Sequence, residues 1–216
     1  MGRKLELHEH AAFIISHSIK IIFACQLIFL AIPEQNMIWI ITTSISLFLS
    51  LLPTILRYLR IFTLPGIIDL MITLALFLHT GVGEMFNVYF TFPNFDMITH
   101  YFSGFIVAFL IFMSLYLVDL KWDEFKIHPY AIAIGTVVGT MAMGVIWEWF
   151  EWLGDYLFHL HSQVDLFDTM VDLAMDTLGG ITMAIIGVYF IGTGGFKRFV
   201  TQIEEDIDDM IKRRNS

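Results

Sequence analysis

The dominant pattern along the chain is a series of long apolar stretches separated by short polar or proline-containing connections. Each stretch is long enough, at about 20 residues, to cross the hydrocarbon core of a bilayer as an α-helix. The pattern therefore predicts an all-α, polytopic membrane helix bundle. We expect about six transmembrane helices, over Ala11–Ile32, Met37–Tyr58, Pro65–Val82, Met97–Val118, Pro129–Leu153 and Phe167–Phe190.

Two residues interrupt the apolar pattern. Pro53 lies inside the second stretch, where we expect it to kink or break the helix because proline removes a backbone hydrogen bond. Lys20 lies inside the first stretch. Its ammonium group could reach the membrane interface along its own stem, or it could pair with a buried carboxylate such as Asp69.

Composition agrees with a membrane protein, because 57% of the residues are hydrophobic and only 15% are charged. The formal net charge of -9 excludes the basic surface expected of a nucleic-acid-binding protein.

Neither a repeat nor a linker is visible within the apolar region. We predict a single transmembrane domain over residues 1–195, followed by a charged cytoplasmic tail over residues 196–216. The expected location is the cell membrane. The lipid bilayer is the expected partner, and partner membrane subunits or a homo-oligomer remain open.

The orientation in the membrane follows from the basic residues, because cytoplasmic loops carry an excess of Lys and Arg. Apart from Lys20, they lie before the first stretch, in every second connection and after the last stretch. These basic residues are Arg3, Lys4, Arg57, Arg60, Lys121, Lys126, Lys197, Arg198, Lys212, Arg213 and Arg214. The other connections contain none. We therefore predict that both termini are cytoplasmic.

Acidic residues and one histidine gather at the ends of three predicted helices. With both termini cytoplasmic, the start of the fourth helix, the end of the fifth and the start of the sixth meet on the extracytoplasmic side. The residues that converge there are Asp96, His100, Glu148, Glu151, Asp165, Asp168 and Asp172. Several are four residues apart and share one helix face, and Asp176 continues the stripe of Asp168 and Asp172.

Clustered carboxylates within a membrane repel one another unless protons or a cation neutralise them. An oxygen-rich set with one imidazole suits a divalent metal ion such as Mg, Mn, Fe or Zn. We therefore predict a divalent metal site formed by these seven residues, its metal left open, with His100 and Glu148 as candidate catalytic residues. A structural explanation competes at Asp96 and Asp165, and partly at Asp168, because an aspartate beside a helix start caps free backbone N–H groups. The loop histidines His159 and His161 could add an imidazole or simply be solvated.

These motifs resemble those of the YjdF-like family of uncharacterised polytopic inner-membrane proteins. The similar segments are Asn94-Phe95-Asp96 with His100 and Gly104, Trp147-Glu148 with Glu151-Trp152, and the stretch from Gln163 to Asp172. The chain departs from the family pattern at Pro93, Val164, Phe167 and Met170. The resemblance supports a membrane helix bundle and implies that the acidic residues and His100 form its site, and it names no reaction.

Three classes of function remain open from the sequence. The first is a metal-dependent enzyme that acts on a lipid or a phosphate ester at the outer leaflet. The second is a proton or cation pathway along Asp168, Asp172 and Asp176. The third is a non-catalytic subunit or assembly factor of a larger membrane complex.

Overall fold

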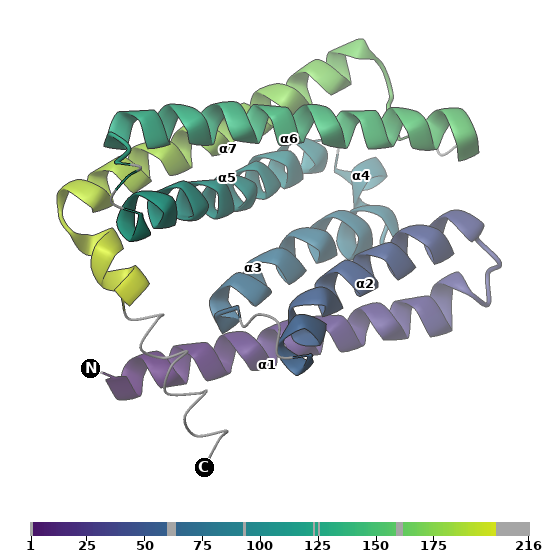
Figure 1. Ribbon diagram of the computed structural model, residues 1–216. Coiled ribbons are helices and arrows are strands. Elements are labelled where there is room, and N and C mark those ends of the chain that lie inside the picture. Colours follow the sequence, from purple (N-terminus) through teal and green to yellow (C-terminus); the bar gives the residue numbers. More distant parts are fainter. Residues whose placement is uncertain are drawn as a thin grey trace. The chain divides into compact units, whose positions relative to one another are not determined.

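The described part of the protein is almost entirely helical. The computed structural model describes residues 2–59, 64–92, 94–122, 124, 126–158 and 162–201, with side chains from residue 9 onward. Within these ranges, six helices are long and apolar enough to cross a membrane (Figure 1). They are Glu9–Ala31, Met37–Tyr58, Gly66–Glu84, Phe95–Lys121, Pro129–Phe158 and Leu166–Gly192. The prediction of an all-helical, multi-pass membrane protein is therefore confirmed.

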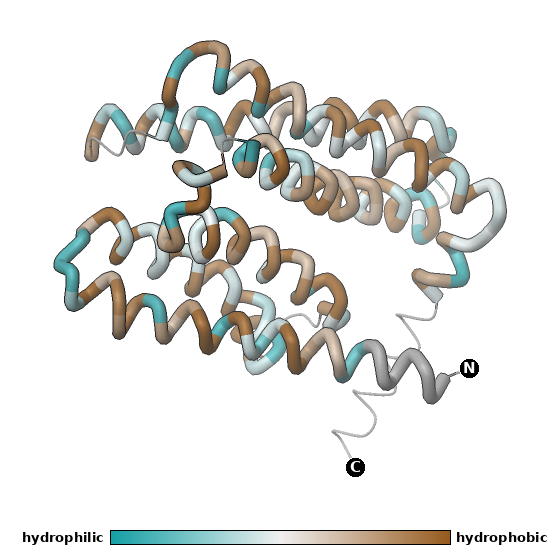
Figure 2. The backbone as a smooth tube through the Cα atoms, turned by 180° about the vertical axis from the view of Figure 1, so that it is seen from behind, coloured by the Kyte–Doolittle hydropathy of each residue, from teal (hydrophilic) through white to brown (hydrophobic). Residues whose placement is uncertain are grey.

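The described residues form two compact units. Unit 1 contains those up to Phe95, and unit 2 contains those from Asp96 onward. In both, long brown apolar stretches are interrupted by isolated teal polar positions (Figure 2). The single transmembrane domain predicted for residues 1–195 and the cytoplasmic position of both termini stay predictions.

Unit 1 is built from helices α1, α2 and α3. Helix α1 (Gly2–Gln26) continues as the π-helix η1 (Leu27–Ala31), and α3 (Gly66–Leu76) continues as the π-helix η2 (Phe77–Glu84). The short α4 (Val88–Thr91) follows η2. Helix α2 (Met37–Tyr58) begins at Asn36, whose side chain accepts a hydrogen bond from the backbone of Trp39. It runs through Pro53 without the break that the sequence allowed.

A buried ion pair connects α1 to α3. The Lys20 Nζ atom lies 2.7 Å from Oδ1 and 2.8 Å from Oδ2 of Asp69. The Ser16 hydroxyl donates to Asp69 Oδ2 at 2.6 Å. Of the two alternatives that the sequence left open for Lys20, the structure selects pairing with Asp69. A charge inside a membrane is tolerated when it is paired and hydrogen-bonded in this way.

Unit 2 is built from α5 (Phe95–Lys121), α6 (Pro129–Phe158) and α7 (Leu166–Gly192). Helices α5 and α7 approach each other closely at two glycines. A Cβ atom at Gly104 would lie 2.7 Å from both the Cα and the carbonyl oxygen of Asp176, and one at Gly179 would lie 2.6 Å from the Phe105 nitrogen. Small residues at such crossings let the backbones of membrane helices pack directly. Here they bring the polar starts of α5 and α7 together.

The chain continues as helix beyond α7, over residues 195–201. This segment includes the first residues of the predicted charged tail. Phe196 and Val200 are nevertheless buried. The Phe196 ring packs edge-on against Phe112 and Tyr116 of α5, so this segment contributes to the apolar packing of unit 2. Residues 202–216 lie outside the described part.

We expect the replacement Gly104→Ala to destabilise unit 2. The new methyl group would collide with the backbone of α7, and overpacking of this kind costs about 1–3 kcal/mol. Thermal unfolding in mild detergent would measure the loss as a lower midpoint temperature. Gly192→Ala is the matched control, because a Cβ at Gly192 meets nothing within 4 Å. Equal midpoints for the two variants would contradict the close crossing.

Candidate metal centre

The starts of α5 and α7 supply three potential metal ligands. Asp96 lies in the first turn of α5, His100 lies one turn later, and Asp172 lies on α7. Each offers one ligand atom, and these atoms all lie within 4.8 Å of one another. His100 and Asp172 are buried, and Asp96 is half-buried. Residues far apart in sequence therefore form one tight group inside unit 2.

Two carboxylates flank the His100 ring on opposite sides. Its Nε2 atom lies 3.8 Å from Oδ1 of Asp96, and its Nδ1 atom lies 3.5 Å from Oδ2 of Asp176. Metal-bound histidines commonly donate their second ring N–H to a carboxylate, which fixes the tautomer and the ring orientation. The Asp176 carboxylate lies on the Nδ1 side of the ring, where it can accept this hydrogen bond. The other ring nitrogen, Nε2, faces Asp96.

Asp176 was absent from the predicted ligand set. Its four-residue spacing from Asp172 already placed the two side chains on one face of α7. Spacing alone does not predict that this carboxylate faces the imidazole of His100, because that contact depends on the close crossing of α5 and α7 at Gly104.

Glu148 approaches from the third helix, α6, and is only 4% exposed. Its Oε2 atom accepts a hydrogen bond from the Gln163 side chain at 3.0 Å. Its Oε1 atom is buried and has no hydrogen-bond partner among the described residues. One turn earlier on α6, a Cβ atom at Gly144 would lie 2.6 Å from Asp176 Oδ2. The face of α6 that carries Glu148 thus packs against the acidic stripe of α7.

Gln163 was not predicted as part of the site. It lies in the connection before α7, and its backbone N–H donates to Oδ2 of Asp155 at 2.9 Å. The neighbouring Ser162 N–H donates to Oδ1 of Asp155 at 2.7 Å. Asp155 therefore holds this connection against the end of α6, and the Gln163 amide then reaches Glu148.

Three of the predicted ligands make other contacts. Asp165 is exposed and caps α7, because its Oδ1 atom accepts from the Asp168 N–H at 2.9 Å. Asp168 Oδ2 accepts from the Val164 N–H at 3.4 Å. Glu151 Oε1 accepts from the Trp147 indole N–H at 3.0 Å. Metal ligation by these three residues stays a prediction, and His159 and His161 lie outside the described residues.

A groove of about 1120 Å³ runs beside Glu148 between the C-terminal half of α6 and the start of α7. Its walls are largely apolar and include Trp149, Trp152 and Leu173. Glu148 and Gln163 contribute polar atoms to the same walls. The groove therefore combines an apolar surface with a buried carboxylate.

The donor set fits a divalent ion. Ligand atoms around an octahedral Mg or Mn ion at about 2.1 Å lie about 3 to 4 Å from one another, which is somewhat closer than the 4.8 Å limit of the Asp96, His100 and Asp172 group. Small side-chain rotations would close that difference. One imidazole with two carboxylates suits Mn, Fe or Zn, and the unpartnered Glu148 oxygen is a further donor of the type that all these ions accept.

Comparison with known proteins places the chain within a family. Residues 15–192 match the family described as "Predicted membrane protein (DUF2238)". The chain belongs to this family. An uncharacterised protein from Thermotoga maritima is 34% identical over 134 residues, which cover 62% of this chain and 67% of that relative. No solved structure matches the chain. The narrower resemblance to YjdF-like proteins stays a prediction.

Proposed function

We propose that this protein is a divalent-cation-dependent membrane enzyme. Asp96, His100 and Asp172 would hold the ion, and Asp176 would orient the His100 ring through Nδ1. The observation that carries the proposal is the Glu148 side chain, which is buried and close enough to His100 and Asp176 to interact with them electrostatically. Its Oε1 atom has no partner at hydrogen-bond geometry among the described residues. A buried, unsatisfied carboxylate oxygen is costly, so such atoms usually mark a functional site.

The reaction that this arrangement best supports is hydrolysis of a phosphate ester. A bound divalent ion would polarise the phosphoryl oxygen and make a water molecule more acidic. Glu148 would accept a proton from the attacking water through Oε1. The water oxygen would form a bond to phosphorus while the bond from phosphorus to the ester oxygen breaks. The leaving oxygen would take up a proton from the medium.

The groove beside Glu148 indicates the substrate class. Its apolar walls, which include Trp149 and Trp152, suit an acyl chain better than a soluble metabolite. Tryptophan side chains are also typical of the membrane interface, where lipid headgroups lie. A phosphate ester of a lipid would place its chain along the groove and its phosphate toward the acidic group.

Phosphate release from a short-chain phosphatidic acid in mixed micelles tests this function. We expect release by the wild-type protein with Mg or Mn, and almost none after chelation. Glu148→Gln keeps the size of the side chain and its bond to Gln163 but removes the base. It should slow release by about a hundredfold or more.

The matched control is Asp119→Asn, because this carboxylate of α5 accepts a hydrogen bond from the Ile127 N–H and belongs neither to the groove nor to the tight group. Its rate should stay close to that of the wild type. Hydrolysis that is unaffected by chelation or by Glu148→Gln would contradict the enzymatic proposal. A protein that binds the cation but releases no phosphate would have a non-catalytic cation site.

A further inference from the structure

A second set of polar side chains, buried or half-buried, lies within unit 1. Helices α1, α2 and α3 each carry polar residues at helical spacing along the faces that they turn to one another. We call this set the polar column. It comprises Ser16, Lys20 and Gln26 of α1, Thr42, Ser46, Ser50 and Thr54 of α2, and Asp69, Thr73, Thr80 and Glu84 of α3 and η2.

Hydroxyl groups of α2 lie between the two ends of the column. Thr42, Ser46, Ser50 and Thr54 are spaced four residues apart, so they form one stripe that rises about 6 Å per step. At one end, Thr54 accepts a hydrogen bond from Lys20 at 3.3 Å. At the other, Thr42 donates to Glu84 Oε2 at 2.8 Å. Ser46 and Thr80 are bonded at 2.8 Å between these ends. Ser50 is fully buried, and its hydroxyl donates to the Leu47 carbonyl of its own helix at 2.8 Å.

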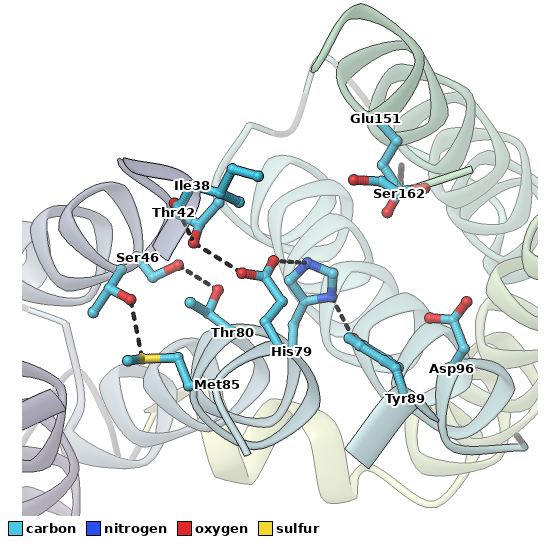
Figure 3. A network of polar contacts seen from close by, with 12 residues as sticks. Ile38, Thr42, Ser46, His79, Thr80, Met85, Tyr89, Asp96, Glu151 and Ser162 are labelled. Carbon is cyan, nitrogen blue, oxygen red and sulfur yellow. Dashed lines mark hydrogen bonds and ion pairs between the residues drawn. The ribbon is translucent and has the colours of Figure 1, made fainter. Parts of the chain in front are cut away.

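Titratable groups stand at both ends. The Lys20–Asp69 pair occupies the end near the start of α3. At the other end, Glu84 Oε1 lies 3.5 Å from His79 Nε2, and His79 Nδ1 lies 2.6 Å from the Tyr89 hydroxyl. Figure 3 shows His79 between Tyr89 and the carboxylate that Thr42 contacts. This end lies on the π-helix η2, and π-helical turns are frequent at functional sites.

The interior of the column contains an unsatisfied acceptor. Gln26 is 3% exposed, and its Nε2 atom donates to the Gly81 carbonyl at 3.0 Å. Its Oε1 atom is buried and lacks a hydrogen-bond partner within the described chain. That oxygen would lie 3.1 Å from a Cβ atom at Gly81, next to Thr80. It lies beside the backbone of η2 at Gly81, where a protonated water molecule could donate to it.

The column covers about three quarters of the thickness of the hydrocarbon core of a membrane. From Asp69 to Glu84 the helix rises about 22 Å, whereas the hydrocarbon core is about 30 Å thick. Ser and Thr hydroxyls alone would be explained by helix packing. Packing requires neither titratable groups at both ends nor an unsatisfied amide oxygen between them.

We propose that the polar column of unit 1 conducts protons across the membrane. A proton would pass between the Lys20–Asp69 pair and the Glu84, His79 and Tyr89 group. The hydroxyls of Ser50, Ser46 and Thr42 would each accept one proton and release another. Thr42 is suited to this exchange, because its hydroxyl lies within hydrogen-bond distance of both Glu84 Oε2 and the Ile38 carbonyl, at 2.8 and 3.1 Å.

The test measures proton uptake by vesicles that contain the full-length protein and a pH-sensitive dye. A potassium diffusion potential set by valinomycin drives the flux. The wild type should acidify the lumen faster than protein-free vesicles. Glu84→Gln and Ser50→Ala should each slow uptake by about tenfold or more, because each removes a link of the column.

Ser114→Ala is the matched control for Ser50→Ala. Ser114 is exposed on α5 of unit 2, and it makes the same kind of local bond, to the Leu110 carbonyl. It should conduct as the wild type does. Wild-type uptake no faster than that of empty vesicles would overturn the proposal. So would undiminished uptake by either Ser50→Ala or Glu84→Gln.

Discussion

Replacement of Asp172 by Asn is expected to weaken divalent-cation binding by more than a hundredfold. Asp172 contributes a carboxylate to the tight group that also contains Asp96 and His100. Asn keeps the shape of the side chain but loses the negative charge that neutralises the cation. Removing an outer carboxylate that orients a metal-bound histidine already costs about 10–100-fold in affinity, so a direct ligand should cost more. Calorimetric titration of the purified protein with Mn would measure both affinities.

A graded series makes this prediction specific. Asp176→Asn should reduce the affinity by about 10–100-fold, because Asp176 would act on the cation through His100. Asp165→Asn should leave it unchanged, because Asp165 instead caps α7. Equal losses for Asp172→Asn and Asp165→Asn would indicate diffuse attraction by an acidic surface. The assignment of a defined site would then be wrong.

The second large effect is expected at the buried ion pair of unit 1. Lys20→Met should destabilise the protein by about 3–5 kcal/mol, because it leaves the Asp69 carboxylate buried and uncompensated. The side chains of Lys20 and Asp69 are only 4% and 9% exposed, so water cannot replace the lost ammonium group. Unfolding in mixed micelles with increasing SDS would measure the free energy of each variant.

The double variant Lys20→Met/Asp69→Asn should recover most of this loss, because the unpaired charge is then gone as well. Lys197→Met controls for the removal of a lysine, since Lys197 is exposed, and it should change stability little. A Lys20→Met protein as stable as the Lys197→Met protein would contradict a buried, paired Lys20. Failure of the double variant to recover would indicate that Lys20 acts through contacts other than Asp69.

Helical spacing and chain direction predicted much of the candidate site. The four-residue interval between Asp96 and His100 placed both on one face of a helix. The alternation of basic connections placed the starts of the fourth and sixth helices on one side of the membrane. The close grouping of Asp96 and His100 with Asp172 in the structure agrees with both inferences.

Features that depend on tertiary contacts were not predictable. The contact of Gln163 with Glu148 requires a connection held in place by Asp155. The π-helical turns of η1 and η2 have no signature in the apolar pattern. Capping and metal ligation produce the same sequence signal at a helix start. Only coordinates reveal that Asp165 bonds to the backbone of Asp168.

The sequence also left the polar column unrecognised. Its hydroxyl residues look like ordinary small packing residues in an apolar helix. Their connection becomes visible only when Thr42 is seen to contact Glu84 and Thr54 to contact Lys20. The sequence suggested Lys20 as a partner of Asp69, but it suggested none for Glu84, whose contacts with Thr42 and His79 depend on how the helices pack.

The measurement that most directly tests the central claim is electron–nuclear double resonance of Mn bound to protein with ¹⁵N-labelled histidine. A single ion held by Asp96, His100 and Asp172 should show strong coupling to one imidazole nitrogen. That coupling should disappear in His100→Gln, while Asp165→Asn should retain it. A bound Mn without nitrogen coupling, or coupling that persists in His100→Gln, would contradict the proposed metal centre.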